Sequence, residues 1–393
     1  MLLWQIYIYG RYTSAISNER NDDMELDELR QQIDDINSQM LSLFAERMRI
    51  SRQIAQYKLE HGMEVFQGSR ERQILDTVKK NAPEGMENAS ELFFQTVMDI
   101  SKCLQFQKLT SAETKNVYKK ADFSKHYVTA VPGAFGSYSQ MAADKLTPDH
   151  EPLFFSDFED VFRAVESGRA NFGVLPIANS TAGSVSLTYE LLKKYDLRIC
   201  QATKIKVSHC LAAKRHTKIE DVTIVYSHEQ AIMQCSDFLR SHGLKAHHYA
   251  NTALAAEYVS DSDEPYAAIC SEKAARDLGL DILERDITDA KENYTKFILI
   301  CKDNLIPEGA NLITVSLALP HQKSALYRLL TKFSVAGLNL TMIKSRPVAN
   351  TDFDAVFYLD FEGDVSEPNV IKLMNELGDE LSYFKFLGNY KEI

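Results

Sequence analysis

The first part of the chain, residues 25–60, places its apolar side chains three and four positions apart. This spacing predicts one long amphipathic helix that contains no glycine or proline and ends before Gly62. Two further helices are predicted over residues 67–80 and 89–108. A first helix of about 36 residues is long for a globular domain and typical of helices that pack along a partner. Its apolar positions are Leu26, Leu29, Ile33, Ile36, Met40, Leu43 and Phe44.

From residue 127 the pattern changes to short apolar strands that alternate with helices. The first strand leads into a Gly- and Ser-rich turn at 132–139, and another into a similar turn at 178–184. This alternation predicts an α/β domain with a mostly parallel sheet, whose ligands lie beyond the carboxyl ends of the strands. The predicted strands are 128–131, 172–177, 205–213, 222–226, 245–249, 266–270 and 297–301, and the helices are 185–194, 228–241, 252–260 and 271–278.

A third pattern begins after Asn304 and Pro307. Its order of strand, helix, strand, strand, helix, strand predicts a ferredoxin-like α+β unit. The ranges are 312–319, 323–336, 338–347, 353–362, 368–379 and 382–390. The chain is thus expected to contain an extension (1–24), a helical domain (25–109), a linker (110–126), an α/β domain (127–303) and a ferredoxin-like domain (312–393).

Composition narrows the classes of partner. A net charge of −11 over 393 residues argues against nucleic acid. The six cysteines form no CxxC pair, which indicates reduced core thiols of a cytosolic protein and neither zinc nor disulfides. The apolar stretch 1–9 has no basic flank or cleavage site and is too short to span a membrane. We expect residues 1–23 to be a disordered extension or to follow an over-called start codon.

The helical segments carry cations and amides at spacings that bring them together. Arg47 and Lys58 lie almost three whole turns apart, and Ser101 and Gln105 lie one turn apart, so each pair shares a helix face. Such donors, without a cysteine or histidine nucleophile, suit a substrate with several carboxylates that needs clamping and charge stabilisation. Arg30 lies roughly 25 Å from Arg47 along the helix, so it would have to come from a second subunit of an interlaced dimer.

Residues 25–108 resemble the all-helical chorismate mutase family. The segments that carry the resemblance are Leu29-Arg30, Ala45-Glu-Arg47, Tyr57-Lys58, Ser69-Arg-Glu-Arg72, and Ser101 with Gln105. It implies that Arg30 of the partner, Arg47 and Arg70 bind the two carboxylates of chorismate. It also implies that Lys58 and Gln105 flank the ether oxygen, while Glu71 and Ser101 hold the ring hydroxyl. Gln67 stands where relatives often have an acid, which we expect to tune the site.

The α/β segment offers two strand–turn–helix junctions whose free amides suit an anion, one with Ser137, Tyr138 and Ser139 and one at 179–184. Residues 127–302 resemble prephenate dehydratase, through the segments 166–168, 173–177, 179–180, 183–185, 227–230, 251–253 and 293–297. The resemblance implies a two-lobed domain like a periplasmic binding protein. It names Thr295 as the residue that assists loss of the ring hydroxyl, without metal or cofactor. The implied substrate-binding residues are Ser137, Tyr138, Ser139, Asn179, Ser180, Thr181, Gln230, Lys296 and Phe297.

Three positions depart from the dehydratase motifs. Ala178 replaces the glutamate that usually follows the Pro-Ile pair, Ala250 stands where a glutamate is common, and Lys296 replaces an arginine. Lysine keeps the charge but loses bidentate carboxylate geometry. Because Thr295, Asn179 and Gln230 remain, we expect an active dehydratase.

The last segment resembles the ACT domain, which implies a phenylalanine effector site. Leu326-Tyr327, residues 337–341 and Ser345-Arg-Pro347 carry the resemblance. A family glycine appears as Ser324 and a family glutamate as Lys344. The implied effector residues are Ser324, Ala325, Leu326, Asn339, Leu340, Ser345 and Arg346.

These patterns predict a bifunctional chorismate mutase and prephenate dehydratase of phenylalanine biosynthesis, cytosolic, dimeric or larger, and without cofactor, metal, nucleic-acid or membrane partner. One alternative keeps only the mutase as an enzyme and makes residues 127–393 a weak regulatory module. The other is a non-enzymatic amino-acid sensor, in which Arg47 and Lys58 would be ordinary surface charges.

Overall fold

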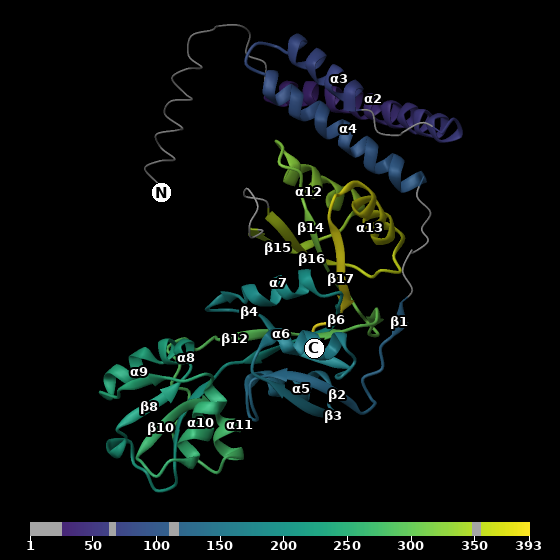
Figure 1. Cartoon of the computed structure of the whole chain (residues 1–393). Coiled ribbons are helices and arrows are strands. Elements are labelled where there is room, and N and C mark those ends of the chain that lie inside the picture. Colours follow the sequence, from purple (N-terminus) through teal and green to yellow (C-terminus); the bar gives the residue numbers. More distant parts are fainter. Residues whose placement is uncertain (1–25, 63–67, 110–117, 348–354) are drawn as a thin grey trace. The chain divides into compact units, whose positions relative to one another are not determined.

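A computed structural model describes residues 26–62, 68–109, 118–347 and 355–393 (Figure 1). The predictions for residues 1–24, for Gln67 and for the first part of the linker lie outside the described residues. The chain divides into two compact units, which meet in the sequence between Gln105 and Phe106.

The first unit consists of three helices close to the predicted ranges. They are α2 (Leu26–Glu60), α3 (Gly68–Asn81) and α4 (Glu87–Leu109). Helix α2 buries only Met48 and Ala55 among its 35 residues. Most of its predicted apolar positions are exposed by 43% or more, so this chain alone covers little of the apolar face of α2. The exposed apolar residues of α2 are Leu26, Leu29, Ile33, Ile36, Met40, Leu41, Leu43, Ile50, Ile54, Tyr57 and Leu59.

The second unit begins with two α/β lobes, each built on its own sheet. The first lobe has the strand order β3-β2-β4-β12-β6, with β5 beside β4, and the second has the order β11-β7-β10-β8-β9. The first lobe contains β2 (Tyr127–Pro132), α5 (Tyr138–Leu146), β3 (His150–Phe155), α6 (Phe158–Glu166), β4 (Phe172–Asn179), β5 (Gly183–Ser184), α7 (Ser186–Lys194), β6 (Arg198–Lys206) and β12 (Tyr294–Cys301). The second contains β7 (His209–Ala213), β8 (Ile224–Ser227), α8 (Glu229–Gln234), α9 (Ser236–Ser241), β9 (Ala246–His248), α10 (Thr252–Asp261), β10 (Tyr266–Ser271), α11 (Glu272–Asp277) and β11 (Asp281–Glu284).

The prediction of a mostly parallel sheet is wrong. Strand β12 runs antiparallel to both of its neighbours, β4 and β6, and β7 runs antiparallel to β10 and β11. The reason is that the chain leaves the first lobe at the end of β6, builds the whole second lobe, and re-enters as β12 at that same end of the sheet, so that Tyr294 pairs with Lys206 and β12 runs back along β6. The predicted single strand 205–213 is likewise two strands of different sheets, separated by Val207 and Ser208.

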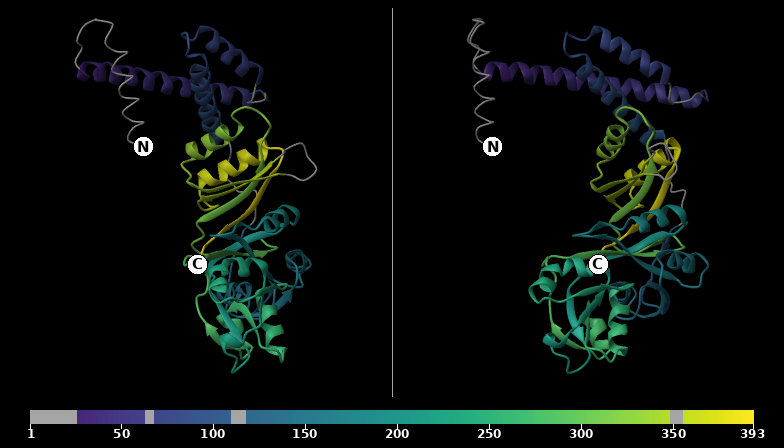
Figure 2. Two further views of the ribbon diagram at one scale, coloured as in Figure 1. Left: turned by 90° about the vertical axis from the view of Figure 1, so that its left-hand side faces the viewer. Right: turned by 60° about the vertical axis from the view of Figure 1, so that its left-hand side comes forward.

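The C-terminal part forms a four-stranded antiparallel sheet in the order β15-β16-β14-β17, which is the ferredoxin-like order that its βαββαβ pattern predicted. Helices α12 and α13 lie on one face of this sheet (Figures 1 and 2). The elements are β14 (Leu312–Ala318), α12 (Ala325–Ala336), β15 (Leu340–Pro347), β16 (Ala355–Glu362), α13 (Pro368–Glu380) and β17 (Phe384–Tyr390). A short pair of strands, β1 (Lys119–Lys120) and β13 (Leu305–Ile306), runs alongside.

The other face of this sheet packs directly on the first lobe. Tyr358 and Tyr390 belong to the same hydrophobic core as residues of β4, α7 and β12. The Lys385 ammonium donates hydrogen bonds to the carbonyl oxygens of Leu192 and Tyr195 at the end of α7, at 2.8 and 2.6 Å. At Gly388 any Cβ atom would meet the carbonyl oxygen of Ile199 at 2.0 Å, so only glycine permits this approach.

Candidate active sites

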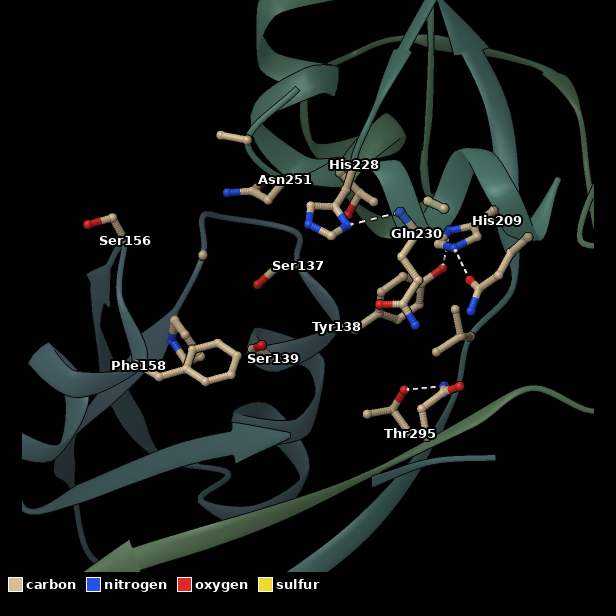
Figure 3. A pocket seen from close by; sticks show the side chains of 18 residues that line it. Ser137, Tyr138, Ser139, Ser156, Phe158, His209, His228, Gln230, Asn251 and Thr295 are labelled. Carbon is tan, nitrogen blue, oxygen red and sulfur yellow. Dashed lines mark hydrogen bonds between the residues drawn. The ribbon is translucent and has the colours of Figure 1, made fainter. Parts of the chain in front are cut away.

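A cavity of about 320 Å³ lies between the two lobes, where the chain crosses from one sheet to the other (Figure 3). Both lobes supply its walls, and we call it the interlobe cleft. Among the residues that the structure describes, no lysine, arginine, aspartate or glutamate lines it. Its lining consists of Pro132, Gly133, Ser137, Tyr138, Ser139, Ser156, Phe158, Asn179, Val207, His209, His228, Gln230, Ala231, Gln234, Ala250, Asn251, Thr252 and Thr295.

Helix amino termini replace cations in this cleft. Ser137 caps α5, where its hydroxyl accepts the amide of Gln140 at 3.3 Å, and Asn251 caps α10, where its Oδ1 accepts the amide of Leu254 at 2.8 Å. Both capping residues line the cleft, one from each lobe. The first turns of these helices therefore face the cleft with unpaired amides and positive dipole ends, which favour a carboxylate.

The turn before α5 depends on Gly136. Its φ of +80° suits glycine, and a Cβ atom there would lie 2.6 Å from the Cα of Ala274 in the second lobe. Its carbonyl oxygen accepts the Ser271 hydroxyl at 2.7 Å. The glycine thus lets the amino end of α5 approach the second lobe closely.

Thr295 lies at the base of the cleft on β12, opposite Asn179 on β4. The Asn179 amide group donates a hydrogen bond to the Thr295 hydroxyl oxygen at 2.9 Å, and its own Oδ1 accepts the Thr181 hydroxyl at 2.7 Å. Because the Thr295 oxygen is already an acceptor in this bond, its hydroxyl proton remains available to a group in the cleft.

A second set of cleft residues was not predicted from the sequence. His209 Nδ1 lies 3.2 Å from the Tyr138 hydroxyl, and its Nε2 lies 3.3 Å from Oε1 of Gln234. The Gln234 amide group in turn donates to the Thr181 hydroxyl at 3.4 Å, which links the second lobe to the loop after β4. Burial lowers the pKa of His209 to about 4, so this histidine is a neutral link at neutral pH. The only sequence signal was a histidine within the apolar strand predicted over residues 205–213.

Two predicted substrate-binding residues do not reach the interlobe cleft. Lys296 follows Thr295 on β12, and successive strand residues point to opposite faces, so its side chain lines a different cavity against the C-terminal sheet. Phe297 is 2% exposed and belongs to the core of the first lobe. The structure therefore places both side chains outside the interlobe cleft. Ser180 and Thr181 do not line the cleft either, although both bond to residues next to it: Ser180 accepts the Tyr294 amide at 2.9 Å.

The three departures from the dehydratase motifs are also divided between the two cavities. Ala250 lines the cleft, whereas Ala178 lies beside Lys296 in the register of β4 and β12 and lines the other cavity. Two of the three departures that weakened the case for an active dehydratase are thus outside the interlobe cleft.

In the helical unit, α2 and α4 bring part of the predicted set together. The Arg47 guanidinium donates to the Val97 carbonyl oxygen at 3.3 Å, and partial burial lowers its pKa. Ser101 and Gln105 on α4 both contact the hydroxyl of Ser51, a residue that the sequence analysis did not name.

The other predicted residues of this unit lie on α2 and α3. Glu71 of α3 pairs with Lys102 at 3.2 Å, and Arg70 donates to Gln73 at 2.6 Å within its own helix. Arg30 is exposed near the start of α2 and pairs with Asp27 at 3.1 Å. Lys58 is partly buried near the end of α2. One chain therefore does not gather the whole set.

The described residues contain no group of three or more histidine, cysteine or acidic side chains placed to hold a metal ion. Their helices include none that is long and apolar enough to cross a lipid bilayer.

Comparison with known proteins defines two successive enzyme domains. The family model of chorismate mutase type II matches residues 29–106, and that of prephenate dehydratase matches residues 129–305. A bifunctional chorismate mutase/prephenate dehydratase of Aquifex aeolicus is 31% identical over 372 residues, which cover 93% of this chain and 98% of that protein. The chain belongs to the family of bifunctional chorismate mutases/prephenate dehydratases.

Two solved structures resemble about two thirds of the chain. One is prephenate dehydratase from Arthrobacter aurescens in complex with L-Phe, with a TM-score of 0.62 and 27% identity over 67% of this chain and 90% of that one. The other is GqqA, described as a novel type of quorum quenching acylase, with a TM-score of 0.62 and 29% identity over 68% of this chain and 98% of that one. Family membership confirms the prediction of a chorismate mutase and prephenate dehydratase.

Proposed function

We propose that Thr295 is the residue that assists departure of the ring hydroxyl when prephenate becomes phenylpyruvate. The C–C bond to the ring carboxylate breaks and releases CO₂, its electron pair enters the ring, and the C–O bond breaks as the ring becomes aromatic. The departing hydroxide takes up a proton and leaves as water, so a positioned hydroxyl donor is sufficient assistance. The observation that carries this role is the hydrogen bond from Asn179 to the Thr295 oxygen, which leaves the threonine proton free.

The substrate carboxylates are assigned to the amino ends of α5 and α10, with Ser137, Ser139, Gln230 and Asn251 as further donors. All four residues line the interlobe cleft, and Figure 3 shows them around the same space as Thr295. This assignment favours full dehydratase activity over the alternative of a weak regulatory module, because the cleft retains its donors.

An Asn179→Asp variant tests the assignment. It keeps the acceptor for the Thr181 hydroxyl but removes the donor to Thr295, so kcat on prephenate should fall about tenfold or more while chorismate turnover stays unchanged. An unchanged kcat on prephenate would contradict the role of Asn179 and of the free threonine proton.

For the mutase, the proposed site combines Arg47, Lys58, Arg70, Glu71, Ser101 and Gln105 of one chain with Arg30 of a second copy. The exposed apolar face of α2 supports the pairing, since contiguous exposed apolar surface of this kind marks an interface. The Claisen rearrangement is unimolecular, so holding a compact conformer and stabilising charge on the ether oxygen provide the acceleration.

Mixing two impaired variants tests the shared site. Arg30→Ala and Arg47→Ala chains should each lose about nine tenths or more of their chorismate turnover, and a mixed dimer should regain one intact site from the two undamaged arginines. Refolding the variants together should therefore restore about a quarter of native activity by random pairing. No recovery would contradict an arginine supplied by the partner.

The ferredoxin-like C-terminal part, residues 312–393, is proposed to be an ACT domain that senses phenylalanine. A cavity of about 610 Å³ lies against the loop before α12 and is lined by Ser324, Ala325 and Leu326. The solved relative with bound L-Phe supports an amino-acid effector. The other implied effector residues do not line this cavity: Asn339, Leu340, Ser345 and Arg346. Asn339 donates a hydrogen bond to Glu362 at 3.0 Å, and the Arg346 guanidinium lies over the Tyr189 ring. Prephenate assays with added phenylalanine should show inhibition that a Leu326→Asp variant loses.

The compartment is proposed to be the cytosol. All six cysteines are buried thiols, which suits a reducing environment.

A further inference from the structure

Three motif departures that lie far apart in the sequence meet at one place. Ala178 on β4, Lys296 on β12 and Lys344 on β15 all line a cavity of about 320 Å³ between the sheet of the first lobe and the C-terminal sheet. We call it the intersheet cavity. Ala178 and Lys296 are paired neighbours in the register of β4 and β12. Two of the three positions hold a glutamate in the usual motifs, so this chain has fewer carboxylates and more space there than the motifs predict.

The charges around the intersheet cavity are unbalanced. The Glu392 carboxylate forms ion pairs with two lysines, at 2.5 Å from the Lys204 ammonium and 3.1 Å from the Lys296 ammonium. Asp360 is 9% exposed and accepts the Thr314 hydroxyl at 2.7 Å. Three lysines and two carboxylates therefore line the cavity.

Lys344 is the cation that lacks an ion pair. Its ammonium lies 3.3 Å from the Tyr189 hydroxyl and 5.4 Å from the centre of that ring. The Arg346 guanidinium lies over the same ring at 5.6 Å. Among the described residues, no carboxylate forms an ion pair with Lys344. Burial lowers the pKa of Lys344, the Asp360 carboxylate partly opposes this, and the cations Arg346 and Lys296 add to the lowering. A bound anion beside the ammonium would raise this pKa again.

The rest of the cavity wall is largely apolar. Ile177, Ile298, Leu312 and Met342 form a hydrophobic lining next to the lysines. A volume of about 320 Å³ lies at the lower end of the range for small-molecule sites. An apolar wall with a few convergent cations suits a compact organic acid and not an inorganic ion.

We propose that the intersheet cavity binds a small organic monocarboxylate, with its carboxylate on Lys344 and Lys296 and its hydrocarbon body against Ile177, Ile298 and Met342. The site is distinct from the interlobe cleft and from the loop cavity before α12. The intersheet cavity and the interlobe cleft share strand β12, because Thr295 faces the cleft and the next residue, Lys296, faces the intersheet cavity. Occupancy of the cavity thus acts on the strand that carries Thr295.

The test uses the full chain and 3-phenylpropanoate as the probe in isothermal titration calorimetry. The native chain should bind the probe, and 2-phenylethylamine, which has the same ring but a positive charge, should not bind. Lys344→Met, which keeps the length of the side chain, should raise the Kd at least tenfold. Lys214→Met removes a lysine that pairs with Asp263 on the surface of the second lobe and should leave the Kd unchanged.

Two more variants locate the probe. Ala178→Leu should also weaken binding by filling the cavity, and Gln230→Ala, which damages only the interlobe cleft, should not. Thermal melting shows that each variant is folded. No binding to the native chain, equal binding to Lys344→Met, or loss of binding in Gln230→Ala would each overturn the proposal.

Discussion

The helical unit and the α/β lobes both act on substrates with two carboxylates, but the two sites that we propose for them bind the negative charge by different means. The helical unit uses long cationic side chains, of which Arg47 is partly buried and Arg30 is exposed. The cleft uses hydroxyls, amides and the amino ends of α5 and α10, with no cationic side chain among its described lining residues. Backbone dipoles are fixed by the fold, so the cleft is preorganised within one chain, whereas the mutase site that we propose takes one of its cations from a second chain.

The largest expected effect is a loss of dehydratase activity when the interlobe cleft loses Thr295. Thr295→Ala removes the proposed proton donor and should lower kcat on prephenate by about 10² to 10⁴-fold, the usual range for a general acid. Chorismate turnover by the same preparation should be unchanged, and Thr223→Ala, at an exposed site in the second lobe, is the matched control. Normal phenylpyruvate formation by Thr295→Ala would remove Thr295 from the mechanism.

The next effect is a pH dependence of folding stability, which tests whether His209 in the cleft is uncharged. Because His209 has a pKa of about 4 in the folded chain and about 6.5 when unfolded, the unfolded chain binds more protons between these values. Stability from the neutral histidine is full above pH 6.5 or so and is lost as the pH falls towards 4, by up to about 3 kcal/mol.

Urea unfolding between pH 7 and 4 measures this dependence. His209→Gln should lack that part of the slope, while His242→Gln, at an exposed position, should keep it. An identical slope in native and His209→Gln chains would mean that His209 is not held neutral.

A smaller effect is expected at Arg47 in the helical unit. Arg47→Met should lower kcat/KM for chorismate by about 10- to 100-fold, as expected for the loss of one charge-assisted hydrogen bond. Dehydratase activity should not change. Arg49→Met on the same helix removes an exposed guanidinium that pairs with Glu46, so it should leave both activities near their native values. Equal losses in the two variants would indicate a general effect on the helix.

The smallest effect is a difference in salt dependence between the cationic site and the cleft. Salt screens partly exposed cations more than amides buried in a cleft. Raising the ionic strength from about 0.05 to about 0.5 M should lower kcat/KM for chorismate about threefold and that for prephenate less than twofold. Steady-state assays of both reactions in the same buffers measure the difference, and a larger salt effect on prephenate would reverse the interpretation.

Much of the fold followed from local patterns. The 3.6-residue period of Leu26 to Phe44 predicted α2, and the order of strands and helices after Asn304 predicted the ferredoxin-like sheet, since both depend on neighbours along the chain. The direction of β12 did not follow, because it depends on where the chain re-enters a sheet after the whole second lobe. His209 and Gln234 were missed for the same reason, as their partners Tyr138 and Thr181 are more than 50 residues away.

By itself, the sequence determined much of the order of helices and strands and the spacing of the candidate side chains, because residue types and their spacing along a helix or turn are local properties. It also determined that Thr295 and Lys296 would point in opposite directions if they lay on a strand. Only the tertiary structure decided that Thr295 faces the interlobe cleft and Lys296 the C-terminal sheet. That choice depends on which surfaces pack on the two faces of β12, and packing between distant segments leaves no local signal in the chain.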